Sequence, residues 1–293
     1  MTITVFTPTY NRGHILPKLY ESLQEQTCKD FEWLVVDDGS TDNTSKLFEQ
    51  WQAEENTFSI RYFKQPNGGK HAAINHGVLE TKSELFFIVD SDDELTADAI
   101  ALIKQRYQKV RDDDTVAGII GMRIYPDGKR IGGEASFEDT ICTRNDFRYK
   151  KKINGDLAEV YKTDILRQYP FPIVEGEKFC PESVVWQKIA KKYKLLFFNK
   201  GIYVCEYLTD GLTHHVDQIR IKSPHLAVIN YVLEYGCDTL LKNKIKDAIN
   251  YWRFRFHCHD RKDDSKIAPW AMPFGWLFYK LDCKKYPEIC KIP

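Results

Sequence analysis

Three carboxylates follow directly on the apolar run of residues 85–89: Asp90, Asp92 and Asp93, with Ser91 among them. Carboxylates at the end of a buried strand repel one another, and only a cation or a hydrogen-bond network offsets that cost. Oxygen ligands at positions i and i+2 suit a hard divalent cation such as Mg²⁺ or Mn²⁺, which is commonly shared with substrate phosphates. The alternative is a solvated helix N-terminus, where Asp suits the helix dipole. The apolar run in front of the cluster favours the metal interpretation.

A second carboxylate pair, Asp37 and Asp38, also follows an apolar run. One of these carboxylates can accept hydrogen bonds from a nucleobase imide or from a ribose hydroxyl. The residues that come next, Ser40, Thr41 and Asp42, are suited to an Asx-turn and to capping a helix. We expect Asp38 to serve a ligand and Asp42 to serve the turn.

Strand and helix patterns alternate over about the first 120 residues. The expected strands are residues 3–6, 31–36, 60–63, 85–89 and 116–121, and the expected helices include residues 15–23, 70–79 and 96–110. This order predicts an α/β fold with a mostly parallel sheet and helices on both faces. Such sheets bind ligands outside the carboxyl ends of their strands. The polar clusters at residues 7–12, 37–40 and 90–93 are therefore expected to converge on one edge.

The second half of the chain has weaker patterns. Residues 123–156 are polar and rich in glycine, which predicts a loop-rich insertion that covers the site. Further on we expect a strand at 157–161, a helix at 181–193 and two paired strands at 195–198 and 202–205. From about residue 218 onward the pattern is helical.

The overall composition excludes several classes of protein. The 293 residues contain 42 Lys and Arg against 42 Asp and Glu, so the balance gives no indication of a nucleic-acid partner. The N-terminus lacks the pattern of a signal peptide, and no apolar stretch reaches the roughly 18 residues of a spanning helix. None of the eight cysteines forms a CxxC pair, so we expect reduced, partly buried thiols. These features predict a cytoplasmic protein, with peripheral contact at the inner face of the cell membrane left open.

Four segments, taken together, are similar to a known family. Residues 7–12, 35–42, 67–77 and 89–93 resemble, in order and spacing, the motifs of glycosyltransferase family 2, which has the GT-A nucleotide-sugar fold. The resemblance covers about the first 95 residues. It implies inverting transfer of a sugar from a nucleoside diphosphate donor, usually a uridine one. The expected division is a GT-A catalytic domain over 1–215, with a nucleotide-sugar half (1–120) and an acceptor-side half (121–215), and a helical C-terminal extension over 216–293.

The resemblance implies roles in donor binding for residues of the first two segments. Pro8 and Tyr10 would wall the base pocket, and Asp38 would contact uracil. Arg12 belongs to the same donor-binding set.

The other two segments would hold the rest of the donor. The resemblance places Asn67 and Lys70 near the ribose or the diphosphate, and Asp90 at the ribose and the donor sugar. Ser91 joins this set. Asp92 would hold the Mn²⁺ or Mg²⁺ that bridges the phosphates.

Inversion by direct displacement also requires a carboxylate that deprotonates the acceptor hydroxyl. The family places this base near the start of a helix, and the best match here is Glu182, followed by Ser183. The family usually has Glu-Asp at this point, so the departure leaves Glu177 as a competitor. The alternative for Glu182 is simple favourable charge at a helix N-terminus.

A polar segment at residues 209–215 ends in two histidines, His214 and His215. Some GT-A enzymes use a histidine on the metal, and a neutral imidazole suits Mn²⁺. Two adjacent histidines cannot both face one site in an extended chain. His214 is our candidate metal ligand, and a loop or capping role stays open for either histidine.

The C-terminal third mixes aromatic and basic side chains at residues 251–257 and 270–280. Such a mixture suits a membrane–water interface, but it also suits a core cover or an oligomer contact. Pro269 and Pro273 argue against one continuous helix there.

The function we expect is an inverting, metal-dependent glycosyltransferase of bacterial surface polysaccharide synthesis that acts on a saccharide or lipid-linked acceptor. A nucleotidyltransferase that makes a nucleotide-sugar and a non-catalytic nucleotide-sugar-binding protein are the alternatives. The motifs specify neither the sugar nor the linkage.

Overall fold

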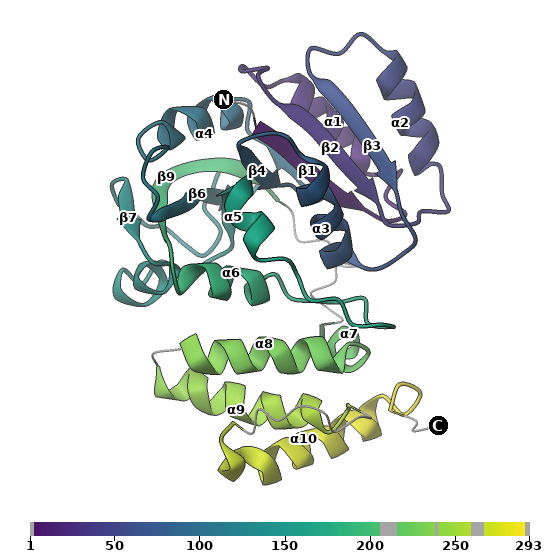
Figure 1. Ribbon diagram of the computed structural model, residues 1–293, viewed down its shortest axis with the longest axis vertical. Coiled ribbons are helices and arrows are strands. Elements are labelled where there is room, and N and C mark those ends of the chain that lie inside the picture. Colours follow the sequence, from purple (N-terminus) through teal and green to yellow (C-terminus); the bar gives the residue numbers. More distant parts are fainter. Residues whose placement is uncertain (1–2, 206–215, 238–239, 259–266, 291–293) are drawn as a thin grey trace. The chain divides into compact units, whose positions relative to one another are not determined.

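The computed structural model describes residues 3–205, 216–237, 240–258 and 267–290, which form two compact units (Figure 1). Unit 1 comprises Met1–Asn67, Ala73–Pro170 and Lys192–Tyr207. Unit 2 comprises Gly68–Ala72, Phe171–Lys191 and Leu208–Pro293. The functional division expected at residue 215 stays a prediction.

Unit 1 is built on a nine-stranded sheet in the order β3-β2-β1-β4-β8-β6-β9-β5, with β7 paired to β9. The strands are β1 (Ile3–Thr9), β2 (Glu32–Asp37), β3 (Ser59–Lys64), β4 (Leu85–Ile88), β5 (Glu94–Leu95), β6 (Val116–Ile124), β7 (Thr140–Cys142), β8 (Leu157–Lys162) and β9 (Lys194–Val204). The neighbours β3, β2, β1 and β4 are parallel, whereas β8 is antiparallel to both β4 and β6. The predicted α/β fold is therefore confirmed, with the parallel pairing concentrated in the first half of the sheet.

Helices flank the sheet on both faces (Figure 1). They are α1 (Leu16–Gln24), α2 (Thr44–Ala53), α3 (Lys70–Glu80) and α4 (Ala99–Tyr107), followed by a short π-helix η1 (Asp146–Lys150) and α5 (Thr163–Gln168). Alternate residues of β1 point to opposite faces. Val5 belongs to the core that α1, α2 and α4 share, whereas Phe6 packs against α3. A Cβ on Gly77 of α3 would lie only 2.1 Å from the Phe6 ring, so glycine permits this close contact.

The expected pair of strands at 195–198 and 202–205 is wrong. A single strand, β9, runs through both segments and pairs with β6 in parallel, with register shifts along the way. Gly201 lies within this strand and permits close packing. A Cβ there would lie 2.6 Å from Cγ2 of Ile124 on β6.

The glycine-rich region 123–156 holds the end of β6, the short strand β7 and the π-helix η1. Two of its glycines, Gly132 and Gly155, have positive φ. A Cβ on Gly132 would lie 2.2 Å from the Asn154 carbonyl oxygen, and a Cβ on Gly155 would lie 2.1 Å from the Ile131 carbonyl oxygen, so the two backbone segments pack closely against each other. A role of this region in covering a site stays a prediction.

Unit 2 is helical in the part that the structure describes. Its helices are α6 (Ser183–Ala190), α7 (Val216–Ile221), α8 (Pro224–Cys237), α9 (Leu241–Arg255), a 3₁₀ turn η3 (Pro269–Ala271) and α10 (Met272–Lys285). Tyr231, Tyr251 and Phe254 are among the buried residues of its core. Within the described residues, no helix has the length and apolar character needed to cross a bilayer. The eight cysteines, all of them described, form no disulfide.

The expectation that no single helix spans residues 270–280 is right only at the start of the stretch, where the 3₁₀ turn η3 precedes α10, and wrong for Pro273. Pro273 lies in the first turn of α10, which continues unbroken to Lys285. A proline is tolerated there because the first N–H groups of a helix have no intrahelical partner.

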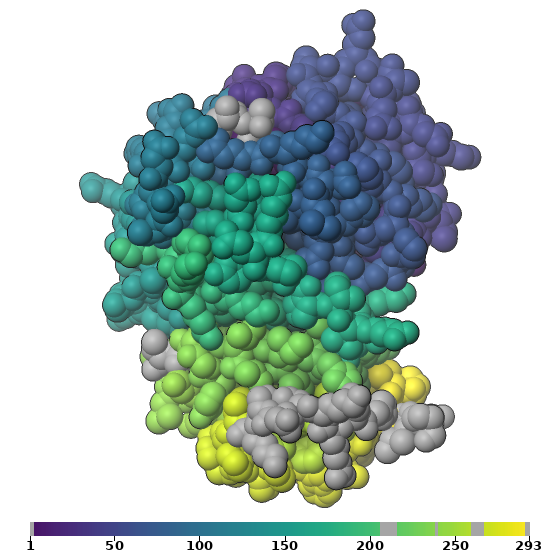
Figure 2. Space-filling model, in the orientation of Figure 1, coloured from purple at the N-terminus to yellow at the C-terminus, as the bar shows by residue number. Residues whose placement is uncertain are grey.

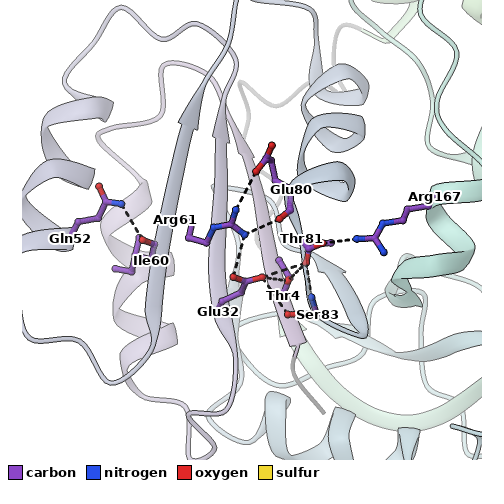
Figure 3. A network of polar contacts seen from close by, with 9 residues as sticks. All are labelled: Thr4, Glu32, Gln52, Ile60, Arg61, Glu80, Thr81, Ser83 and Arg167. Atoms are coloured by element: carbon purple, nitrogen blue, oxygen red, sulfur yellow. Dashed lines mark hydrogen bonds and ion pairs between the residues drawn. The ribbon is translucent and has the colours of Figure 1, made fainter.

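A polar network ties the amino ends of β1, β2 and β3 to the end of α3 (Figure 3). The Glu32 carboxylate accepts a hydrogen bond of 2.5 Å from Thr4 Oγ1 and lies 3.5 Å from an Arg61 guanidinium nitrogen. Arg61 also donates to the Glu80 carbonyl, and Arg167 donates to the Thr81 carbonyl at 2.6 Å. This network closes the edge of the sheet opposite to the carboxyl ends of the parallel strands.

Candidate active-site residues

The three polar clusters of the N-terminal half share the carboxyl edge of the strands β2, β1 and β4, which are neighbours in the sheet. The Asp38 N–H donates to the Thr9 carbonyl at 2.8 Å, and the Val89 N–H donates to the Phe6 carbonyl at 2.8 Å. These bonds continue the parallel ladders to the strand ends. The expected convergence is thus present in unit 1.

Asp37 serves the local structure of this edge. It is fully buried and accepts hydrogen bonds from the Ser40 N–H at 2.7 Å and from the Tyr62 hydroxyl at 2.5 Å. Burial and the neighbouring Asp37 carboxylate raise the pKa of Tyr62 well above its usual value, so the phenol stays a donor. Asp37 thereby holds the turn that presents the next residue.

Asp42 joins the turn after β2 to the turn after β1. Its carboxylate accepts from the Gly13 N–H at 2.9 Å and from the Thr44 N–H at 3.1 Å. Burial alone would raise the pKa of Asp42, but the hydrogen bonds from Thr44 and Gly13 lower it below its usual value. Asn11, in the left-handed region with φ of 54°, adds a bond from its N–H to Ser40 Oγ. The structure places Asp42 in the turn, as expected.

Asp38 is held by a chain of polar side chains. The carboxylate is 3% exposed and accepts a hydrogen bond of 2.8 Å from Gln65 Nε2. Gln65 Oε1 in turn lies 2.8 Å from His76 Nδ1. Sequence reasoning did not find these two partners, although His76 lies inside the segment 67–77 that carries the family resemblance.

The other candidates of this edge differ in exposure. Pro8 is buried in β1, Arg12 is half-buried, and Tyr10 is 49% exposed. Asn67 lies beside the turn after β2, because a Cβ on Gly39 (φ 87°) would be 3.1 Å from the Asn67 backbone nitrogen. Tyr10 thus presents an exposed aromatic ring at this polar edge.

The carboxylates after β4 have different environments. Asp90 and Asp92 are half-buried, whereas Ser91 and Asp93 are buried. The Tyr203 hydroxyl of β9 joins both ends of the cluster: it accepts from the Asp90 N–H at 2.9 Å and donates to Asp93 Oδ2 at 2.7 Å. Tyr203 therefore stabilises the conformation of the loop after β4 through both of its ends.

The Asp93 carboxylate lies near a buried arginine side chain. Arg123 lies 3.8 Å from Asp93 Oδ2, and its guanidinium stands 4.1 Å from the centroid of the Tyr203 ring. Burial and the nearby Asp90 raise the pKa of Asp93 to about 7, against the opposing effects of Tyr203 and Arg123. Asp93 is thus a structural member of the cluster, and the more accessible carboxylates are Asp90 and Asp92.

The donor set at this loop fits a hard cation. Asp90 and Asp92 offer carboxylate oxygens at positions i and i+2, and such ligands suit Mg²⁺ or Mn²⁺ that keep waters and take phosphate oxygens. Across residues 3–205 and the described helices of unit 2, no three His, Cys, Asp or Glu side chains gather around a common point. His214, our other candidate ligand, lies outside the described residues, as does His215.

Within unit 2, the start of α3 lies against the segment before α6. Gly69 (φ 91°) approaches so closely that a Cβ would be 2.1 Å from the Lys178 carbonyl oxygen. The next residue, Lys70, extends its Nζ to 2.8 Å from Glu182 Oε1. Both side chains are about one-third exposed, at 36% and 29%. The candidate base is therefore an accessible carboxylate paired with Lys70, which belongs to the segment 67–70 with Gly68 and Gly69, hereafter the glycine-rich motif.

Glu182 stands at the N-cap of α6, as expected, but its side chain makes no capping hydrogen bond. The following residue explains the departure from the family's Glu-Asp pair. Ser183 Oγ donates to Asn230 Oδ1 at 2.6 Å, which ties α6 to the buried face of α8. A hydroxyl at this position serves packing within unit 2 and leaves Glu182 as the carboxylate of the motif.

Glu177 has a structural role. Its carboxylate is 8% exposed and accepts from the His225 N–H and the Leu226 N–H, both at 2.9 Å, at the start of α8. In addition, His225 Nδ1 lies 2.7 Å from Glu177 Oε1. The carboxylate thus satisfies N–H groups that have no intrahelical partner and complements the helix dipole. Glu177, the other candidate for the base, therefore caps the start of α8.

Comparison with known proteins identifies the family. The model of the family described as "Glycosyl transferase family 2" matches residues 4–163. The chain belongs to this family, and it is a glycosyltransferase with the GT-A fold.

Two curated relatives come from bacteria. Glycosyltransferase GlyG of Streptococcus pneumoniae is 37% identical over 214 residues, which are 69% of each protein. The GalNAc(5)-diNAcBac-PP-undecaprenol beta-1,3-glucosyltransferase of Campylobacter jejuni is 28% identical over 212 residues. That match covers 69% of this chain and 63% of the relative, so the chain spans less than two thirds of that protein's length.

Two solved structures share the fold. S. aureus TarS 1-349 in complex with UDP-GlcNAc has a TM-score of 0.63 at 17% identity, covering 99% of this chain and 82% of the other. The mannosyltransferase PcManGT of Pyrobaculum calidifontis, in complex with GDP-Man and Mn²⁺, has a TM-score of 0.57 at 19% identity, covering 96% and 75%.

Proposed function

We propose that this glycosyltransferase transfers a sugar, with inversion, from a uridine diphosphate donor to a saccharide or lipid-linked saccharide acceptor of a bacterial surface polysaccharide. The observation that supports this best is the edge formed by β2, β1 and β4, which brings the Asp38 and Asp90–Asp92 clusters to one side of the sheet. The relatives named above include a glucosyltransferase whose name specifies an undecaprenol-linked acceptor. Residues 1–215 would form the catalytic domain and 216–293 its helical extension.

For the donor base, we assign the residues that follow β1 and β2. Tyr10 would stack on the uracil, with Pro8 beneath it and Arg12 nearby. Asp38 would accept from the uracil imide N–H, and the bond from Gln65 fixes the carboxylate for that purpose. One structure with this fold, TarS, binds UDP-GlcNAc, whereas PcManGT binds GDP-Man, so the assignment to uridine rests on the family resemblance and is tested below against a guanosine donor.

For the sugar and the diphosphate, we assign the loop after β4 and the glycine-rich motif. Asp90 would bind the ribose and the donor sugar with Ser91 beside it, and Asn67 and Lys70 would approach the ribose or the diphosphate. Asp92 would hold a divalent cation, with His214 as a further ligand. When bound, such a cation offsets the charge that develops on the departing diphosphate.

The chemical step is a direct displacement. The acceptor oxygen attacks the anomeric carbon, the bond from that carbon to the diphosphate oxygen breaks, and the diphosphate leaves with the electron pair. Glu182 takes the proton of the acceptor hydroxyl. The carboxylate suits this role because it is accessible and makes no capping hydrogen bond on α6. Neither alternative from the sequence is favoured, because the family assignment makes the chain a glycosyltransferase.

A test of this function is UDP release from a panel of UDP-sugars and GDP-Man, with and without Mn²⁺. We expect release from at least one uridine donor, dependence on Mn²⁺ or Mg²⁺, and a hydrolysed or transferred sugar of inverted anomeric configuration by NMR. Release from GDP-Man alone would contradict the assignment of the base pocket, and retention of configuration would contradict the role of Glu182.

A further inference from the structure

The last helix of unit 2 presents large apolar side chains to solvent. What we call the α10 surface consists of Trp270, on the turn η3 just before the helix, and of five residues of α10, each between 43% and 53% exposed: Phe274, Trp276, Leu277, Phe278 and Leu281. The helix forms part of the yellow C-terminal segment in Figure 2. Contiguous exposed apolar patches on a protein generally mark a binding surface.

The packing of α10 explains why its apolar side points outward. Its inward side has Gly275, where a Cβ would lie 2.3 Å from the Trp252 Cβ, and the buried Asp282. Asp282 accepts from Arg253 Nε at 2.7 Å and lies 3.1 Å from His257 Nε2. A surface helix normally buries its apolar stripe. Here a small residue and a carboxylate face α9, and both would be displaced if the helix rotated to bury its aromatic rings.

Basic side chains continue the same surface toward the end of the helix. Lys280, Lys284 and Lys285 are exposed, and Lys280 Nζ stands 5.4 Å from the centroid of the Trp276 ring. Residues 240–258 and 267–290 contain eight Lys and Arg against three Asp and Glu. Two of those three carboxylates, Asp247 and Asp282, are buried. The described surface of this region is therefore strongly positive.

We propose that the α10 surface docks on an anionic lipid bilayer, with the aromatic rings in the headgroup region and the lysines on the lipid phosphates. Trp and Phe beside Lys are favoured at such an interface, where lysine stems extend along apolar surface while the charge stays in water. The core of a protein–protein interface is depleted in lysine, which argues against a second copy as the occupant. This proposal does not rest on the donor or the base assigned above.

The test is co-sedimentation of the full chain with vesicles of phosphatidylcholine alone and with one-quarter phosphatidylglycerol. We expect binding to the anionic vesicles, a fall in binding with added salt, and a blue shift of tryptophan fluorescence. The variant Phe274→Ser/Trp276→Ser should bind at least tenfold more weakly, and Lys280→Glu/Lys284→Glu should lose the preference for anionic vesicles.

Two control variants test whether the loss of any exposed leucine or lysine would weaken vesicle binding. Leu79→Ser and Lys82→Glu remove an exposed leucine and an exposed lysine of unit 1, and both should bind like wild type. UDP release from a soluble donor should be unchanged in the α10 variants, which separates this proposal from the proposed function. Equal binding of wild type and Phe274→Ser/Trp276→Ser would overturn it. The proposal would also be overturned if light scattering showed that the wild type is a dimer and that Phe274→Ser/Trp276→Ser is a monomer.

Discussion

Lys70 Nζ lies 2.8 Å from Glu182 Oε1, which joins the glycine-rich motif at the start of α3 to the N-cap of α6 within unit 2. The two residues are 112 positions apart in the chain. Glu182 is about 29% exposed, and its side chain does not cap the helix on which it stands. A partly exposed ion pair of this kind contributes little to stability. Gly69 permits the close approach to Lys178 that brings Lys70 to Glu182, and we propose that this pair serves the reaction.

Asp92 is expected to govern the metal dependence. Asp92→Asn removes a carboxylate charge while keeping the shape of the side chain, so UDP release should fall by about 100-fold or more, because metal stabilisation of a leaving group is worth several kcal/mol. The apparent affinity for Mn²⁺, measured by titrating UDP release, should weaken in parallel. Asp114→Asn, an exposed aspartate of the same unit, is the matched control. Wild-type response of Asp92→Asn to Mn²⁺ would show that the cation is held elsewhere.

Asp38 is expected to select the base. Asp38→Asn should weaken binding of UDP by roughly tenfold or more, since a hydrogen bond to a charged group is worth about 1.5–3 kcal/mol. Gln65→Leu should have a smaller effect in the same direction, because Gln65 acts only by orienting the carboxylate. Calorimetric titration with UDP and with GDP measures both effects. If Asp38→Asn weakened UDP and GDP equally, the contact with uracil would be refuted.

Glu177 is expected to affect stability and not chemistry. Glu177→Gln replaces charge-assisted bonds to the His225 and Leu226 N–H groups with weaker ones, which should cost about 1–2 kcal/mol. Thermal unfolding should show a lower midpoint, while kcat measured well below that midpoint should stay within about twofold of wild type. Glu175→Gln, an exposed neighbour, should change neither quantity. A large loss of kcat in Glu177→Gln, with an unchanged midpoint, would make Glu177 the base.

Asp282 is expected to make the stability of unit 2 depend on pH. Burial alone would raise the pKa of Asp282, but His257 and Arg253 lower it below its usual value. A carboxyl whose pKa is lower in the folded chain stabilises the fold above its unfolded pKa of about 3.9, and this stabilisation is lost as the pH falls through the folded pKa. Asp282→Asn should therefore be less stable than wild type at pH 7.

The difference in free energy of unfolding between wild type and Asp282→Asn should narrow as the pH falls below about 4. Thermal unfolding between pH 7 and pH 3 measures it, with Asp114→Asn as the control that keeps the wild-type dependence. A difference between wild type and Asp282→Asn that stays constant down to pH 3 would contradict the pairing of Asp282 with Arg253 and His257.

The sequence predicted the parts of the molecule that local patterns specify. Alternating strands and helices placed the clusters at residues 7–12, 37–40 and 90–93 on one edge, and turn chemistry placed Asp42 in the turn after β2. The ligand role of Asp38 stays a prediction. The individual strands, helices and turns depend on residues close together in the sequence, and the parallel pairing that brings the clusters to one edge follows from the order of these elements.

The features that sequence reasoning missed depend on distant partners. Tyr203 supports the loop after β4 from 110 residues away. Glu177 and Glu182 have similar local surroundings, and only the position of α8 shows which one is a helix cap. The outward direction of the aromatic rings of α10 follows from Gly275 and Asp282, whose contacts are all on α9 and the turn after it.

Glu182 is proposed as the base of an inverting transfer. The most direct measurement is to compare Glu182→Gln with wild type in UDP release and in calorimetric binding of the same UDP-sugar with Mn²⁺. Our account predicts a fall in kcat of roughly 10²–10⁴-fold with donor affinity within about threefold of wild type, because a general base acts on the acceptor proton alone. A Glu182→Gln enzyme that kept the wild-type kcat would contradict it.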